Sequence, residues 1–110
     1  MCKCRAQVAE TLHNMAVVRD YQKRFDEAIS LYQRALEMQK RVLGTDSIGV
    51  GETSQALAGC LADAQRVTEA LPHVELAIAI YELTTKGHHP KYEYCLKLKK
   101  DIKIAIERNE

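Results

Sequence analysis

The sequence predicts an all-α fold in which two antiparallel helical hairpins stack side by side and a fifth helix caps the stack. Residues recur at a fixed spacing, since Val8 returns as Val50, 42 positions later, and a period of this length is typical of helical repeats. Apolar residues make up 46% of the chain, with no Trp, two Pro and five Gly, which favours helix over sheet. The other recurring pairs are Glu10 and Glu52, Thr11 and Thr53, Ala16 and Ala58, Arg24 and Arg66, Glu27 and Glu69, Ala28 and Ala70, and Ala35 and Ala77.

The spacing of apolar residues and the capping signals predict where the helices begin and end. In the first helix, Val8, Leu12 and Met15 recur at the period of one helix face. The second is expected to stop at Gly44, because glycine is common just beyond a helix C-terminus. Thr68 is expected to cap the fourth. The expected helices span residues 6–21, 26–43, 50–64, 68–85 and 91–108.

The fifth helix is expected to have one packed face and one solvated face, which the end of a repeat stack needs. Its apolar stripe is Tyr94, Leu98, Ile102, Ala105 and Ile106, and its basic residues lie mostly elsewhere. Because one hairpin cannot bury its apolar face alone, we expect a single domain over residues 1–110. Its first repeat should span 6–47, its second 48–89, and its terminal helix 90–108.

Composition and charge exclude several classes of protein. Sixteen basic and fifteen acidic residues give a net charge of +1, so no overall field steers the protein to nucleic acid or to a membrane surface. No apolar run approaches the roughly 20 residues that span a bilayer. The charged first residues are not followed by the apolar stretch of a signal peptide. We therefore expect a cytoplasmic protein with its four cysteines reduced.

The recurring segments resemble a known family. Residues 12–16 (Leu-His-Asn-Met-Ala) are similar to a Leu-Asn-Asn-Leu-Ala segment, and residues 24–28 (Arg-Phe-Asp-Glu-Ala) to a basic-aromatic-acidic-Glu-Ala turn. Residues 31–38 (Leu-Tyr-Gln-Arg-Ala-Leu-Glu-Met) are close to the helix that follows. The segments to which they are similar are those of the tetratricopeptide repeat, so the chain resembles this family. The chain resembles its long variant, found in kinesin light chains, whereas the short form repeats at about 34 residues. The resemblance implies a right-handed superhelix and a role in binding proteins.

Several positions depart from the family pattern. Lys23 and Gln65 stand where the turn has glycine, and Ser54 replaces the first large apolar residue of its helix. The 42-residue register also puts Lys99 and Lys100 where the motif has Leu and Ala. We therefore expect the fifth helix to rotate or shift relative to a true repeat.

The resemblance implies that the first helix of each hairpin lines a concave, peptide-binding face. Asn14 matches a family asparagine that contacts peptide backbone, which suits a carboxamide because it both donates and accepts hydrogen bonds. Ala56 stands at the equivalent position of the second repeat, so a row of such asparagines is absent. The residues expected to contact a peptide are His13, Asn14, Val17, Tyr21 and Gln55.

The charge of this face indicates which peptides it would take. Glu10, Asp20, Glu52 and Asp63 make it mildly acidic, and it lacks the Lys and Arg set that would grip a C-terminal carboxylate. We expect it to favour neutral or basic segments.

Neither a metal site, nor a cofactor, nor catalysis is expected. Cys2 and Cys4 have the spacing of half a zinc site, but no second pair follows them, and Cys60 and Cys95 should be partly buried in helices. No nucleophile elbow, phosphate-binding glycine loop or metal-binding helix pair is present. The Lys-rich fifth helix is interpreted as a solvated face, so no nucleic acid partner is expected.

The leading hypothesis is an adaptor or scaffold that binds a peptide or helix of a partner protein, by analogy with kinesin light chains a cargo or motor-related one. The alternative is a self-associating assembly element, such as a homodimer through the open first helix, or a piece of a longer repeat array. Exposure of Val8, Leu12 or Val18 would favour the alternative, because exposed apolar patches mark interaction sites.

Overall fold

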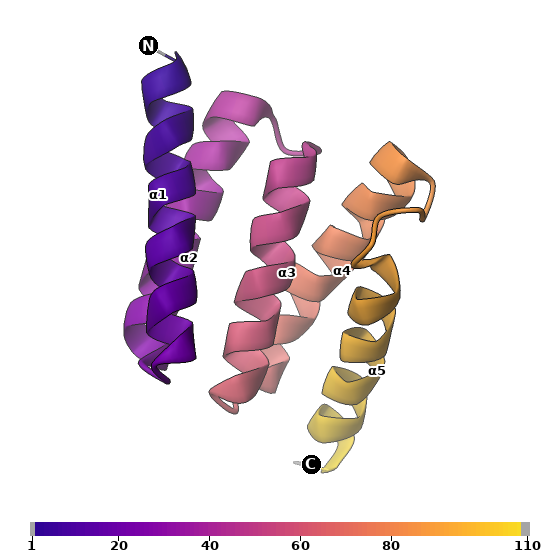
Figure 1. The fold of residues 1–110 in the computed structure, drawn as a ribbon. Helices are drawn as coiled ribbons and strands as arrows, with labels where there is room; N and C mark the ends of the chain where they lie inside the picture. Colours follow the sequence, from indigo (N-terminus) through magenta and orange to yellow (C-terminus); the bar gives the residue numbers. More distant parts are fainter. Residues whose placement is uncertain (1, 109–110) are drawn as a thin grey trace.

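The computed structural model describes residues 2–108, with side chains from residue 7 onward. Helices α1 and α2 form one antiparallel hairpin, α3 and α4 form a second, and α5 runs back beside α4 (Figure 1). Within these residues every regular element is a helix, which confirms the all-α repeat fold. None of the described helices is long and apolar enough to cross a membrane. The helices are α1 (Cys2–Tyr21), α2 (Phe25–Leu43), α3 (Ile48–Asp63), α4 (Val67–Thr85) and α5 (Tyr92–Arg108).

The two hairpin turns are copies of each other at the level of the backbone. The amides of Lys23 and Arg24 donate to the carbonyls of Asp20 and Arg19, and the same two bonds recur 42 positions later. Lys23 has a φ of 64° and Gln65, its counterpart, a φ of 66°. The turn therefore keeps its left-handed residue even without glycine, at a cost of about 1–2 kcal/mol per residue.

Helix starts follow the repeat rather than the local capping signal. The expectation that Thr68 caps α4 is wrong, because α4 begins at Val67 and Thr68 lies in its first turn. The residue at the N-cap is Arg66, whose guanidinium is bound to Glu69 at 2.6 and 2.7 Å. Ser47 does cap α3, accepting a bond from the amide of Val50.

Small residues lie where paired helices pack most closely. The alanines that recur between the two repeats at positions 16, 28, 35, 58, 70 and 77 are all fully buried. Gly51 extends this contact in the second hairpin, since a Cβ there would lie 2.9 Å from Cγ2 of Ile80. Tyr32 and Tyr81 are the largest buried side chains and fill the space beside these contacts.

Helix α5 keeps the repeat register, contrary to the expectation that it rotates or shifts. Cys95 and Ile102 are buried against the stack, and they stand 42 positions after Thr53 and Cys60, which are buried in α3. Lys99 does not force a rotation, because its ammonium reaches the Glu75 carboxylate of α4 at 3.5 Å.

The apolar stripe expected for α5 is partly confirmed. Ile102 is buried, and Leu98, Ala105 and Ile106 pack against the core. Tyr94 is half exposed instead. Its hydroxyl lies 3.5 Å from where Gly59 of α3 would carry a Cβ, so Tyr94 belongs to the contact between α3 and α5.

Two glycines of α3 should respond oppositely to alanine. Gly59→Ala should raise the free energy of unfolding by about 1 kcal/mol through helix propensity, because its Cβ meets only the Tyr94 hydroxyl at ordinary contact distance. Gly51→Ala should lower it by about 1 kcal/mol, since overpacking against Ile80 outweighs the same propensity gain. Urea unfolding followed by circular dichroism measures both. Equal shifts for the two variants would contradict the close approach of α3 and α4.

Candidate peptide-binding groove

Helices α1, α3 and α5 run in the same direction on one face of the stack, with α2 and α4 behind them (Figure 1). Helices α1 and α3 contact each other far less than either contacts α2. Pockets lined by residues of both helices form a groove between them, and we call it the inner groove. On α1 it is lined by one helix stripe, which consists of Glu10, His13, Asn14, Val17, Asp20 and Tyr21.

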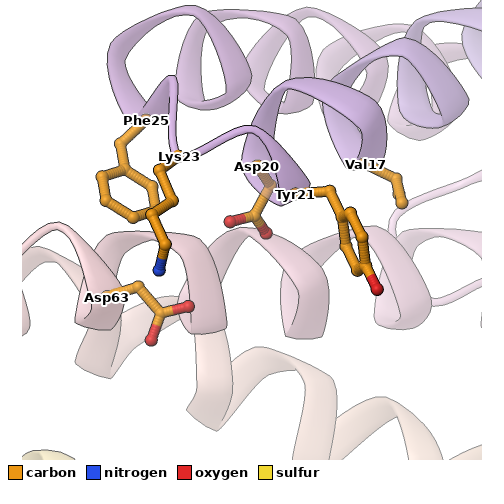
Figure 2. Close-up of a pocket in the computed structure, with 6 residues that line it drawn as sticks. All are labelled: Val17, Asp20, Tyr21, Lys23, Phe25 and Asp63. Carbon is orange, nitrogen blue, oxygen red and sulfur yellow. The ribbon is translucent and has the colours of Figure 1, made fainter.

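The groove holds two pockets. The upper pocket, of about 350 Å³, lies near the start of α3, and the lower pocket, of about 560 Å³, lies near the ends of α1 and α3. Figure 2 shows the side chains of the lower pocket. The upper pocket is lined by Glu10, His13, Asn14, Gln39, Leu43, Gly49, Glu52 and Thr53, and the lower by Val17, Asp20, Tyr21, Lys23, Phe25 and Asp63.

In the upper pocket a histidine joins the two helices. The Nδ1 atom of His13 is hydrogen-bonded to the hydroxyl of Thr53 at 3.0 Å, and its ring meets that of Tyr32 edge-on, with centroids 5.6 Å apart. Burial lowers the pKa of His13, against the opposing field of Glu52. Burial therefore favours the neutral form of His13, whose bond to Thr53 joins α1 to α3.

The lower pocket is electrostatically negative. Burial and then the charge of Asp63 raise the pKa of the Asp20 carboxyl. The same field acts on the groups around it: burial and then Asp20 raise the pKa of the Cys60 thiol to about 12, and burial and then Asp63 raise the pKa of Tyr94. The negative ends of the α1 and α3 dipoles lie at this end of the groove as well.

The acids of the groove are left without strong partners, whereas several acids elsewhere are paired. Among the described side chains, Glu10, Asp20 and Asp63 form no ion pair, and Glu52 meets only the ring of His89 at 3.4 Å. By contrast, four acidic residues outside the groove each hold a basic side chain. These pairs are Glu27 with Arg24, Glu37 with Arg41, Glu69 with Arg66, and Glu75 with Lys99.

The structure brings four of the five expected contact residues into the inner groove. His13 and Asn14 line the upper pocket, and Val17 and Tyr21 line the lower one. Gln55 differs from the expectation, because it is only 8% exposed and its Oε1 atom has no hydrogen-bond partner. It stands 42 positions after His13, in α3.

The second helix of the first hairpin also contributes to the groove, which the sequence reasoning missed. Gln39 and Leu43 from the end of α2 line the upper pocket, and Phe25 from its start lines the lower one beside Lys23. The expectation considered only first helices. Phe25 was recognisable as the aromatic residue of the hairpin turn, but nothing in the sequence turns it toward α3.

The cysteines and histidines do not come together as a metal site in the described part of the chain. No three His, Cys, Asp or Glu side chains are grouped there so that they could hold an ion. Cys60 and Cys95 are free and fully buried, more so than expected. His89 stacks on Tyr81, and its Nδ1 atom accepts a bond from the amide of Lys91. The side chains of Cys2 and Cys4 lie outside the described residues.

A stack of antiparallel hairpins with a groove along its first helices defines a helical-repeat binding protein. The family model of the tetratricopeptide repeat matches residues 7–83. The chain therefore belongs to the tetratricopeptide repeat family, whose repeats are non-enzymatic modules for protein–protein interaction. No curated protein matches the chain.

Asp20→Asn should stabilise the fold at neutral pH. The folded state raises the pKa of Asp20, so it binds the proton more tightly than the unfolded chain, and ionisation destabilises it. The wild type should therefore lose stability relative to the variant as the pH rises through the folded pKa. Because solvent screens this half-open site, the gain at pH 7 should be about 0.5 kcal/mol.

Thermal unfolding between pH 3 and pH 7 measures this difference. Asp46→Asn, in an exposed loop away from the groove, is the matched control for removing one carboxylate. An Asp20→Asn variant that is less stable than the wild type at pH 7 would contradict a destabilising carboxylate in the lower pocket.

Proposed function

We propose that this chain is an adaptor or scaffold module whose inner groove binds a neutral or basic, extended segment of a partner protein. The observation that supports the proposal most is the set of groove acids without strong partners, beside the exposed side chains of Val17 and Tyr21. The proposal takes residues 6–47 and 48–89 as the two repeats of one domain and residues 90–108 as its terminal helix.

The groove has the dimensions of a short peptide site. From Glu10 to Tyr21 the α1 stripe covers 11 helical steps, or about 16 Å at about 1.5 Å per residue. A peptide in extended conformation would cover that length with about five residues. Asn14 lies near the middle of the stripe, where its amide group can both donate to and accept from the peptide backbone.

Rigidity of the receptor would supply part of the affinity. The hydrogen bond between His13 and Thr53 joins α1 to α3, and both helices are held from behind by α2. The groove is therefore formed before the peptide arrives, so that the peptide bears most of the cost of ordering. The similarity of the repeat to that of kinesin light chains supports a cytoplasmic partner that is a cargo or motor-related protein.

A second candidate function, self-association, is favoured by the outer flank of α1. We call Val8, Thr11, Met15 and Val18 the open flank. Val8 is 48% exposed, Met15 44% and Val18 51%. Their counterparts 42 positions later are Val50, Leu57 and Cys60, which are fully buried beneath α2. The open flank therefore has the surface of a helix that another helix covers. Leu12 is not part of it, because it is buried against α2.

Charges around the open flank would suit a second copy of the chain. Arg19 of α1 and the pair Asp26 and Glu27 of α2 border a hollow that also contains Met15 and Leu31. In a two-fold symmetric dimer the same patch faces itself, so the basic side of one copy can meet the acidic side of the other. This arrangement leaves the inner groove open.

The peptide proposal predicts a preference of charge and a dependence on Asn14. Basic peptides should bind more tightly than acidic-tailed peptides of equal length in fluorescence anisotropy titrations. Asn14→Ala should lower the affinity of the basic peptides about five- to tenfold, which is the equivalent of one or two hydrogen bonds. Leu83→Ala, at an exposed position of α4, should leave binding unchanged. Tighter binding of the acidic set would overturn the proposal.

The self-association proposal predicts a mass that depends on concentration. Light scattering during gel filtration in reductant should show a dimer at high concentration for the wild type. The double variant Met15→Asp and Val18→Asp should be monomeric throughout, because each charge would be buried without a partner. Leu83→Asp, which adds a charge to another exposed leucine, should dimerise like the wild type. A wild type that stays monomeric at every concentration would contradict this candidate.

A further inference from the structure

The lower pocket concentrates negative charge that its one lining cation, Lys23, neutralises only in part. Asp20 and Asp63 both line it, and Asp63 is the last residue of α3. The negative ends of two helix dipoles add to the two carboxylates. Lys23 is the cation that lines the pocket, and neither acid pairs with it among the described side chains. With two carboxylates and one ammonium, the lining keeps a net negative charge that is complementary to a basic group of a partner.

Aromatic rings flank these carboxylates. Tyr21 is 91% exposed, an unusual placement for so large a ring, and Phe25 is partly exposed. Figure 2 shows Asp20 between the side chains of Tyr21 and Lys23, with Phe25 beyond Lys23 and the Lys23 ammonium directed toward Asp63 of α3. A flat cation with hydrogen-bond donors around its edge suits such a site, because it can stack on a ring and present its donors to carboxylates.

From this complementarity, and resting on the proposed function, we infer that the lower pocket is a subsite for an arginine side chain of the bound peptide. The guanidinium would take the place of the Lys23 ammonium beside Asp20 and Asp63, donate to both carboxylates and stack on Tyr21, while Val17 covers its aliphatic stem. A lysine would satisfy the charge, but it has neither the planar fork nor the stacking surface.

Other occupants fit the pocket less well. A metal ion would find only two carboxylates, and no group of three metal-ligating side chains occurs among the described residues. The upper pocket is a weaker cation site, because its Glu52 already meets His89, and Lys91 adds a positive field there. A guanidinium in the lower pocket would also offset the charge of Asp63, which, after burial, raises the pKa of Asp20.

The test compares three seven-residue peptides of Ala and Ser, labelled with fluorescein, that differ only at the central residue. That residue is arginine, lysine or citrulline, which keeps the shape of arginine without its charge. In anisotropy titrations the arginine peptide should bind about tenfold more tightly than the citrulline peptide, as expected for a charge-assisted pair. It should also bind about threefold more tightly than the lysine peptide, because stacking adds to the charge.

Variants assign this preference to the pocket. Asp63→Asn, at an exposed position, should lower the affinity of the arginine peptide to that of the citrulline peptide. The affinity of the citrulline peptide should not change. Tyr21→Ala should remove the advantage of arginine over lysine. Lys23→Ala should strengthen the binding of the arginine peptide, because it removes a competing cation. Asp46→Asn, outside the groove, is the control for the loss of one carboxylate and should change nothing.

The outcomes separate this inference from the proposed function. If the arginine and citrulline peptides bind equally well and Asn14→Ala weakens both, the groove binds peptides but the arginine subsite is wrong. If the lysine peptide binds as tightly as the arginine peptide, the pocket recognises charge alone and the proposed stacking on Tyr21 is wrong. If none of the peptides binds in a way that Asn14→Ala affects, the proposed function fails and the subsite fails with it.

Discussion

The close approach of paired helices at small residues is the constraint on which the rest of this structure depends. Ala16 and Ala28 in the first hairpin, and Ala58 and Ala70 in the second, are fully buried at equivalent positions, and a longer side chain at any of them would overpack the contact. These contacts bring each first helix against its second helix, so that only a thin contact remains between α1 and α3. The inner groove is a consequence of how the hairpins pack rather than a separate feature.

The carboxylates of the inner groove do not stabilise the fold. Asp20 is held where burial and Asp63 both disfavour its charge. The outer acids, by contrast, are paired with arginine or lysine at Glu27, Glu37, Glu69 and Glu75. Isolated surface pairs contribute little to stability, but each places a positive charge beside its carboxylate. The carboxylates without a Lys or Arg partner lie in the groove, where two helix dipoles also end, so their negative charge is open to a basic partner.

The period of 42 residues made the helices and their pairing predictable, because it repeats the small contact residues and the turns. The prediction that α5 rotates, which rests on Lys99 and Lys100, is wrong, because a long side chain such as Lys99 can leave the interface and reach Glu75 while Cys95 and Ile102 keep the register. The contributions of Phe25, Gln39 and Leu43 to the groove depend on the angle between hairpins, which a pattern along one helix does not determine.

The central claim is that the face of α1 and α3 between the hairpins is the binding surface. The most direct test is to map a bound basic peptide on the ¹⁵N-labelled protein by NMR. The account predicts that the amide shifts concentrate around Glu10, Asn14 and Val17 of α1 and around Glu52 and Asp63 of α3. Shifts that concentrate instead on the open flank of α1, or on the outer surfaces of α2 and α4, would contradict it.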